Sequence, residues 1–242
     1  MNYLMLIWAD GMPTPEQLAV MQRELPAWNQ DTTRRGVRVR GRELDLPETA
    51  ATVRVRGAET LVTDGPFAET KEFIAGFDLL RCVDLDEAIE VATQCPISQF
   101  QPLEIRPFAD GLPLDEQASA FATDDDPVGS SYLLNSWIGD TPAEPYDNQR
   151  ALTEHCRSWR RDLKAQGLHV FGNELKSPDT ARTVRVRDGE TVLSEGPFTQ
   201  LEQHLAGIDV VSCGDRPQAV ELAATHPIAR YHTIEVRPFY SE

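Results

Sequence analysis

The sequence of 242 residues contains little cysteine and no long apolar run. Its four cysteines include no Cys-x-x-Cys pair, which favours reduced thiols and a cytoplasmic location. No stretch approaches the roughly 18 consecutive apolar residues of a membrane-spanning helix, so we expect no membrane association. The apolar start at residues 1–8 is short and has no basic residue, which predicts a first strand rather than a signal peptide.

Basic residues are scarce relative to acidic ones. The chain has 23 Lys and Arg against 39 Asp and Glu, which gives a formal net charge of −16. A surface of this charge repels phosphate, so we expect no nucleic-acid partner. The sequence contains no phosphate-binding P-loop, no Gly-x-Gly-x-x-Gly and no Gly-x-Ser-x-Gly. Its five histidines show no metal-ligand spacing, and we expect neither a metal nor a cofactor.

What the sequence does contain is a long internal repeat. Segment 60–67, which ends in Asp-Gly-Pro-Phe, returns 131 residues later as segment 191–198, which ends in Glu-Gly-Pro-Phe. The same separation relates further segments in order: 52–56 to 183–187, Cys82 to Cys213, and 104–108 to 235–239. One separation shared by so many segments indicates a duplicated domain. We predict a first domain at 1–108, an acidic linker at 109–131 and a second domain at 132–242.

Each copy alternates strand and helix patterns. In the first copy, apolar runs and period-2 alternation predict strands near residues 3–8, 37–41, 52–57, 60–63, 77–83 and 103–108. Helices are predicted to begin after Thr14 and Asp84, which are suitable N-caps. Pro26 is expected to kink or break the first helix. The pattern predicts an α+β fold, a ferredoxin-like core that carries an extra hairpin.

A sheet with helices on one face needs cover for its other face. Two copies in one chain can supply that cover to each other. We therefore predict two tandem ferredoxin-like domains that pack sheet against sheet as an intramolecular pseudo-dimer. The protein would then be a monomer acting as a pseudo-dimer, or a homodimer of it.

Two pairs of arginines alternate with valines in the repeated strands. Arg54 and Arg56 belong to the first copy, and Arg185 and Arg187 to the second. Alternation places the arginines of each pair on one face of the strand and the valines on the other. The arginines either form a solvated face with salt bridges or line the space between the copies. In the second case their guanidinium groups would bind a small anionic ligand, such as a carboxylate, phosphate or enolate.

Acidic residues and histidines supply the other candidate site groups. Asp64 either closes the turn before Gly-Pro through its side chain or acts as a site acid. Glu195 takes the equivalent place in the second copy and, with its longer side chain, closes such a turn less well. His226 is either an ordinary partly buried histidine or pairs with His155 in a cleft.

Several of these segments together carry a family resemblance. Val-Arg-Val-Arg at 53–56, Asp-Gly-Pro-Phe at 64–67, Glu-Thr-Lys-Glu at 69–72 and Glu-Ile-Arg-Pro-Phe at 104–108 resemble the DGPF branch of the YCII-related superfamily. The second copy resembles it more loosely. The resemblance implies a ferredoxin-like dimeric α/β barrel. It also implies a regulatory partnership with a sigma factor, since this branch is often encoded near extracytoplasmic-function sigma factors.

The resemblance also implies where an enzymatic site would lie. Enzymatic members of the superfamily are associated with a histidine in the first helix and an aspartate directly before a proline after the last helix. Here the positions before proline hold Cys95 and His226, and the first-helix positions fall near Leu25 and Cys156. The histidine–aspartate pair therefore does not carry over to this sequence.

Three functions remain open from the sequence. The first is a small-ligand-binding or regulatory module without enzymatic activity. The second is a lyase or isomerase acting on a small anionic or aromatic compound, with Asp64, Glu195 or His226 as acid or base and Arg54 or Arg185 binding the anion. The third is a structural module that uses the fold only to dimerise.

Overall fold

The structure is a computed structural model that describes residues 1–9, 11–67, 71–109, 114, 131–139, 149–199 and 201–240. The chain forms an α+β fold that divides into two compact units, each assembled from three segments. Unit 1 comprises Met1–Glu43, Thr70–Glu116 and Leu175–Gln200, and unit 2 comprises Leu44–Glu69, Gln117–Glu174 and Leu201–Glu242. Nearly all of the predicted linker at 109–131 lies outside the described residues. No helix in the described part of the chain is long and apolar enough to cross a membrane.

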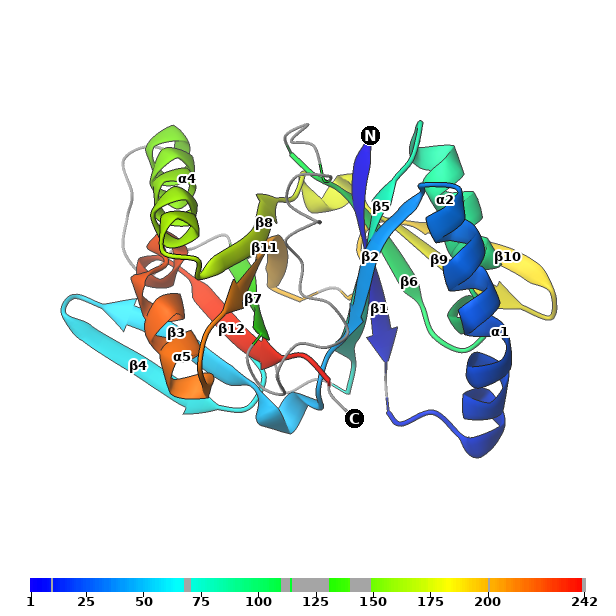
Figure 1. The fold of residues 1–242 in the computed structure, drawn as a ribbon, viewed down its shortest axis with the longest axis horizontal. Coiled ribbons are helices and arrows are strands. Elements are labelled where there is room, and N and C mark those ends of the chain that lie inside the picture. The colour runs from blue at the N-terminus through cyan, green and yellow to red at the C-terminus, as the bar shows by residue number, and fades with distance from the viewer. Residues whose placement is uncertain are drawn as a thin grey trace. The chain divides into compact units, whose positions relative to one another are not determined.

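The described residues of unit 1 form one six-stranded antiparallel sheet, covered by the helices α1 and α2 (Figure 1). Its own copy contributes β1 (Asn2–Ala9), α1 (Pro15–Arg34), β2 (Arg38–Glu43), β5 (Phe73–Arg81), α2 (Leu85–Gln94) and β6 (Leu103–Pro107). The other copy contributes β9 (Arg182–Arg187) and β10 (Glu190–Glu195). The strand order is β10-β9-β6-β1-β5-β2, so the central strands β6-β1-β5-β2 have the ferredoxin-like arrangement.

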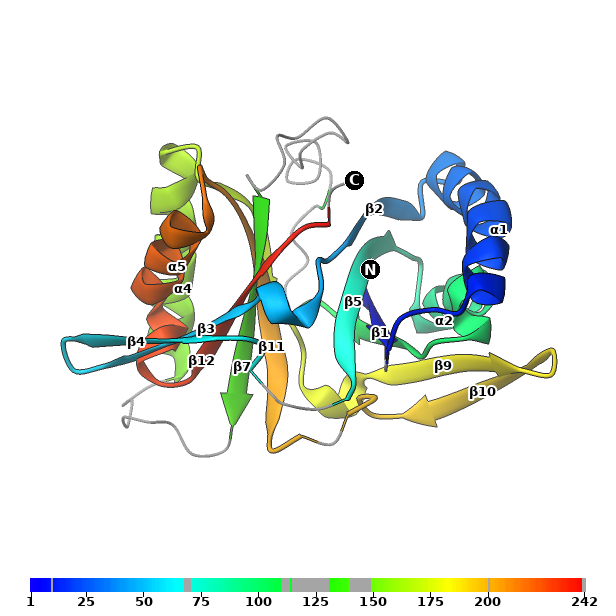
Figure 2. The ribbon, with the colours of Figure 1, turned by 90° about the horizontal axis from the view of Figure 1, so that it is seen from below.

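Unit 2 repeats this plan. Its own copy contributes β7 (Ser131–Gly139), α4 (Gln149–Ala165), β8 (His169–Glu174), β11 (Gln203–Ser212), α5 (Arg216–Thr225) and β12 (Thr233–Pro238). The first copy contributes β3 (Ala51–Arg56) and β4 (Glu59–Asp64), and the strand order is β4-β3-β12-β7-β11-β8. Figure 2 shows α4 and α5 together on one face of this sheet.

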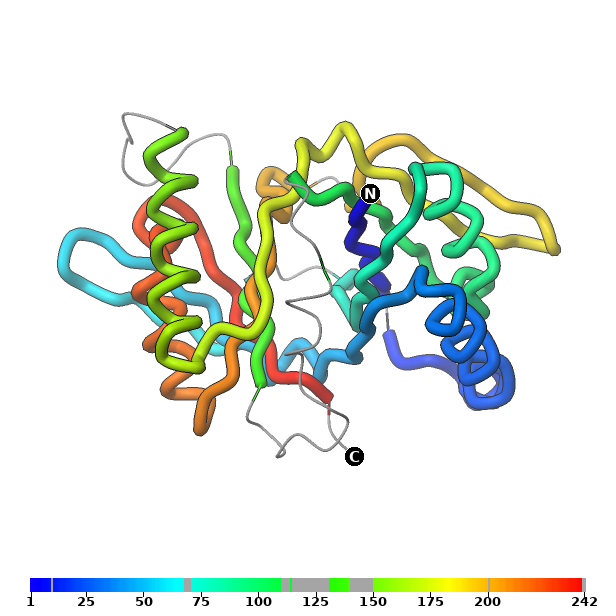
Figure 3. The backbone as a smooth tube through the Cα atoms, turned by 45° about the horizontal axis from the view of Figure 1, so that its top comes forward, coloured from blue at the N-terminus to red at the C-terminus, as the bar shows by residue number. Residues whose placement is uncertain are grey.

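The extra hairpin of each copy completes the sheet of the unit built around the other copy. In unit 2, Val53 of β3 lies opposite Ile234 of β12. In unit 1, Val184 of β9 lies opposite Leu103 of β6, which is the same register. Figure 3 shows the yellow-to-orange β9–β10 hairpin among the blue and green segments of unit 1. Sequence predicts such a hairpin from local alternation, but the sheet edge that it joins is decided by tertiary contacts.

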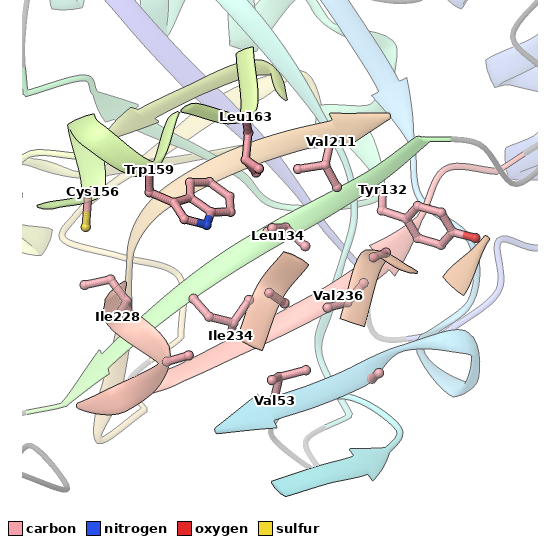
Figure 4. Close-up of a cluster of buried hydrophobic side chains, with 14 of the residues drawn as sticks. Val53, Tyr132, Leu134, Cys156, Trp159, Leu163, Val211, Ile228, Ile234 and Val236 are labelled. Atoms are coloured by element: carbon pink, nitrogen blue, oxygen red, sulfur yellow. The ribbon is translucent and has the colours of Figure 1, made fainter. Parts of the chain in front are cut away.

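Each unit has its own apolar core between the sheet and its helices. In unit 2 the core includes Leu134 of β7, Trp159 of α4 and Ile234 of β12, and Val53 of the exchanged hairpin packs into it (Figure 4). Val184 packs into the core of unit 1 in the same way. Valines of the alternating strands therefore face the helices, as their spacing predicts.

The local helix signals are mostly confirmed. Thr14 caps α1: its hydroxyl accepts from the Gln17 backbone N–H, and the Gln17 side chain accepts from the Thr14 N–H. Of the kink or break expected at Pro26, the break does not occur: α1 continues through this residue to Arg34. Pro26 is exposed, so water can reach the backbone carbonyl that its missing N–H leaves unpaired.

Candidate functional site

A buried aspartate in unit 2 is the centre of the candidate site. Asp209 lies in the middle of β11, on the face that carries the apolar core, and is fully buried. Gly172 of β8 lies directly opposite in the sheet. A Cβ atom at position 172 would stand 1.8 Å from Asp209 Oδ1, so only glycine leaves room for the carboxylate.

Three basic side chains surround this carboxylate, and we call the four residues the Asp209 cluster. Arg160 of α4 donates from Nε to Oδ1 at 2.7 Å and from Nη2 to Oδ2 at 3.2 Å. His169 Nε2 lies 2.9 Å from Oδ1. His226 Nε2 approaches Oδ2 at 3.4 Å without completing a hydrogen bond. The side chains of His226 and His169 are 1% and 6% exposed, so solvent has little access to the cluster.

Local structure sets the orientation of His226. It is the C-cap of α5 and directly precedes Pro227, which begins a short 3-10 turn. Its Nδ1 accepts a hydrogen bond from the Ile228 backbone N–H at 3.2 Å, so the neutral ring carries its proton on Nε2, toward Asp209. The Trp159 ring packs edge-on against the ring, with centroids 4.5 Å apart.

The electrostatics of the cluster follow from burial and charge. Burial alone would raise the pKa of Asp209, but Arg160 and the two histidines outweigh it and hold that pKa well below its usual range. Burial lowers the pKa of His226, and the Asp209 carboxylate opposes this only in part. Asp209 is therefore a carboxylate and His226 a neutral imidazole near neutral pH.

Unit 1 has fewer polar side chains at the position equivalent to the Asp209 cluster. Asp78 of β5 accepts from Arg38 Nε at 2.5 Å, and Gly41 lies opposite it just as Gly172 lies opposite Asp209. Cys95 takes the position of His226, and burial raises the pKa of its thiol to about 12. Burial also raises the pKa of Asp78, because Arg38 offsets the desolvation only partly. The first copy thus has one buried ion pair where the second has four polar groups.

The histidines and arginines that the sequence suggested as site residues do not lie together in one site. His226 belongs to the Asp209 cluster, but His155 is exposed on α4, so the two do not pair. Arg54 is half-buried, donates to Thr233 Oγ1 at 2.8 Å and lies 5.9 Å from the Phe67 ring.

Its counterpart Arg185 lies in unit 1, with its guanidinium 4.9 Å from the Phe198 ring. Arg56 and Arg187 are exposed at the ends of their strands. A role of these four arginines in binding a ligand stays a prediction.

The acids before Gly-Pro do not close their turns through their side chains. Asp64 Oδ1 accepts from Arg216 Nη2 at 2.7 Å, and Glu195 Oε1 lies 3.7 Å from Arg182 Nη2. Both acid side chains are strongly exposed.

The turns themselves are held by other groups. Thr52 and Thr183 donate from their hydroxyls to the carbonyls of the following turn glycines at 3.1 and 3.2 Å, and the glycine N–H groups donate to backbone carbonyls. An Asx-type turn was therefore the wrong expectation for Asp64, because Pro66 has no N–H to donate to its carboxylate and the Phe67 N–H donates to Glu235 Oε2 instead.

Comparisons with known proteins agree with the repeat. The YCII-related domain family matches residues 1–109 and again residues 136–241. This protein belongs to the YCII-related domain family. An uncharacterized protein of Rhizobium meliloti (strain 1021) is 48% identical over 69 residues, which span 26% of this chain and 54% of that relative. A solved structure titled "Crystal structure of Putative Chlorite dismutase" covers 99% of this chain and 94% of its own, at TM-score 0.43 and 9% identity.

Within the Asp209 cluster, only His226 falls on a position that the resemblance associates with the enzymatic histidine–aspartate pair. His226 occupies the position before proline, and Cys156 of α4 lies near the expected first-helix position. Burial raises the pKa of Cys156 to about 12, so it remains a neutral thiol. No group of three His, Cys, Asp or Glu residues in the described part of the chain is arranged to hold a metal ion.

Proposed function

We propose that this YCII-related protein is a small-ligand-binding module and that the Asp209 cluster of its second copy forms the binding site. One observation carries the proposal: the second copy keeps Arg160, His169 and His226 around its buried aspartate, whereas the first copy keeps a single arginine. In unit 1 a single ion pair between β2 and β5 is enough at this place. The additional polar groups in unit 2 are therefore available for another role.

Arg160 is the group through which a ligand would bind. Asp209 engages two of its nitrogens. Among the described residues, the only partner of Nη1 is Glu174 Oε1 at 3.9 Å, a loose contact with a side chain that is 31% exposed. A small anion can displace Glu174 and accept hydrogen bonds from the guanidinium in its place. The ligand class that fits is therefore a small carboxylate or phosphate compound.

The cluster is better suited to binding than to acid–base chemistry. Asp209 is held as a carboxylate with a depressed pKa by several donors, which makes it a weak base. His226 uses Nδ1 to accept from the backbone and directs its proton toward Asp209. The most buried titratable groups are thus occupied by one another.

A regulatory role is part of the proposal. The resemblance to the DGPF branch supports a sigma factor as the protein partner and a cytoplasmic location, and binding of a small anion would be the signal. Copurification of the protein with and without added anion against a candidate sigma factor would test the partnership separately from the site.

The binding proposal is tested by calorimetric titration of the full chain with phosphate, acetate and benzoate. We expect saturable binding of at least one of these anions. The matched variant Arg160→Asn copies Asn29 of the first copy and should lose binding, whereas Arg157→Ala on the same helix should keep it. Absence of binding by all three anions, or unchanged affinity of Arg160→Asn, would contradict the site.

One contact favours a second candidate function, that of a lyase or isomerase. The 2.9 Å contact of His169 with Asp209 has the geometry of a base oriented by a carboxylate. Hydrogen–deuterium exchange into small carbonyl compounds, followed by NMR, would detect such a base. Exchange that disappears in His169→Gln would favour the enzyme over the binding module.

A further inference from the structure

A second polar site lies on the opposite face of the unit 2 sheet from the Asp209 cluster. Asn135 and Trp137 alternate with the core residue Leu134 along β7, so they face away from the helices. Glu235 of β12 lies opposite Asn135 in the sheet. Asn135, Trp137 and Glu235 are 0%, 5% and 5% exposed, although all three carry polar groups.

At the equivalent place in unit 1 the tryptophan N–H has a hydrogen-bond partner. Trp8 donates from Nε1 to Glu104 Oε2 at 3.0 Å, and the Phe198 backbone N–H donates to the same oxygen at 3.0 Å. Leu6 fills the position of Asn135 and is completely buried. Burial raises the pKa of Glu104, and Arg106 at 3.4 Å opposes that rise.

Unit 2 departs from this arrangement in one substitution and one lost hydrogen bond. Phe67 N–H still donates to Glu235 Oε2 at 2.9 Å, but Asn135 Nδ2 now donates to Glu235 Oε1 at 3.4 Å. Trp137 Nε1 and Asn135 Oδ1 have no hydrogen-bond partner among the described residues. The Trp137 ring stacks on Phe67, with centroids 5.5 Å apart and planes at 25°, and in unit 1 Trp8 contacts Phe198 at 5.7 Å with planes at 53°.

Two unmade hydrogen bonds at one place are costly. A buried donor or acceptor without a partner costs about 1–3 kcal/mol, and a leucine at position 135 would avoid one of the two, as Leu6 does in unit 1. The donor and the acceptor stand two residues apart on the same face of β7, about 7 Å along the strand. A purely structural role does not account for this pair.

We propose that this place, which we call the Trp137 site, binds a small neutral molecule that carries hydroxyl groups. A hydroxyl oxygen accepts from Trp137 Nε1, and a hydroxyl proton is donated to Asn135 Oδ1. The charged groups around the site already have partners: Arg237 lies 3.6 Å from Glu235, and Arg54 donates to Thr233. A neutral ligand therefore fits better than an ion, and the site is separate from the anion site at Arg160.

The test uses the full chain labelled with ¹⁵N at its four tryptophan indoles. Glycerol, catechol and myo-inositol are titrated one at a time, and the Trp137 indole cross-peak is assigned through Trp137→Phe. We expect at least one probe to shift this cross-peak saturably and to leave the Trp8 cross-peak in place, because Trp8 Nε1 is already bonded to Glu104.

The matched control is Asn135→Leu, which gives unit 2 the residue that packs at this place in unit 1. This variant should fold and should weaken the response of the Trp137 cross-peak at least tenfold, while Arg157→Ala on the exposed side of α4 should not change it. A Trp137 cross-peak that none of the three probes moves would overturn the proposal. The same holds if the Trp137 indole N–H exchanges only with water. A response that persists undiminished in Asn135→Leu would overturn it as well.

Discussion

The two buried aspartates of this protein occupy the same position in two copies of one fold, yet their surroundings differ. Asp78 has Arg38 and a neutral thiol nearby, and burial raises its pKa. Asp209 has an arginine and two histidines, and its pKa is depressed. Duplication thus left one copy with the minimum that holds the fold and the other with a larger set of polar groups. Comparison of the copies separates structural requirements from candidate functional ones.

Removing each aspartate charge gives the largest expected difference between the units. Asp209→Asn leaves Arg160 buried without its counter-ion and should lower the free energy of unfolding by about 3–5 kcal/mol. Asp78→Asn should cost clearly less, because burial raises the pKa of Asp78 whereas Arg160 and the histidines lower that of Asp209. Urea unfolding followed by circular dichroism measures both. Equal losses would show that the two aspartates play the same part.

The glycines opposite the aspartates should behave alike in both units. A Cβ atom at Gly41 or Gly172 would come within 1.8 Å of a carboxylate oxygen. Each Gly→Ala change should therefore destabilise its unit by about 2–3 kcal/mol through overpacking. Gly214→Ala, where the nearest atom would be 3.4 Å away, is the control and should have little effect. If alanine were tolerated at position 172 but not at position 41, the Asp209 side chain would be able to move away from the added methyl group.

The pH dependence of stability should distinguish the copies through His226. Its pKa is lowered in the folded protein, so the unfolded chain binds the extra proton. Stability should be unaffected above the ordinary histidine pKa near 6.5 and should fall as the pH drops below it. His226→Cys, which copies Cys95, should remove up to about 2 kcal/mol of the loss between pH 7 and pH 5. Identical pH profiles for the two proteins would contradict a neutral buried His226.

The hairpin turns should give the smallest effects and the same ones in both copies. Thr52→Val and Thr183→Val each remove a hydroxyl bond to a turn carbonyl and should cost about 1 kcal/mol. Asp64→Ala and Glu195→Ala remove exposed ion pairs and should cost at most about 0.5 kcal/mol. Thermal unfolding of the four variants gives the ranking. A larger loss for Asp64→Ala than for Thr52→Val would restore the carboxylate as the turn-closing group.

Local patterns in the sequence predict most of the fold. Alternation at 52–56, the cap at Thr14 and the separation of 131 residues each correspond to an element or to the repeat. The exchange of hairpins is not predictable in this way, because alternation does not specify which sheet edge a strand joins. Pro26 shows the same limit, since its local chemistry predicts a kink or a break whereas α1 continues through it to Arg34.

The candidate site was only partly predictable. The sequence pointed to His226 because it replaces an expected aspartate before proline, but Asp209, Arg160 and His169 were missed as its partners. A usable signal was present: Asp78 and Asp209 both interrupt apolar strand segments, and they are related by the same separation as the rest of the repeat. A charged residue inside a buried strand requires partners. The identity of those partners depends on contacts with α4 and α5 that sequence spacing does not give.

The claim that function resides in the second copy is tested most directly by native mass spectrometry of the full chain against metabolite pools. The variant Arg160→Asn/His169→Arg/His226→Cys gives unit 2 the residues of unit 1, and the variant Asn29→Arg/Arg38→His/Cys95→His makes the opposite exchange in unit 1. We expect the parent protein to retain a small anionic adduct and the first variant to lose it while remaining folded. An adduct that survives in the first variant would contradict the account.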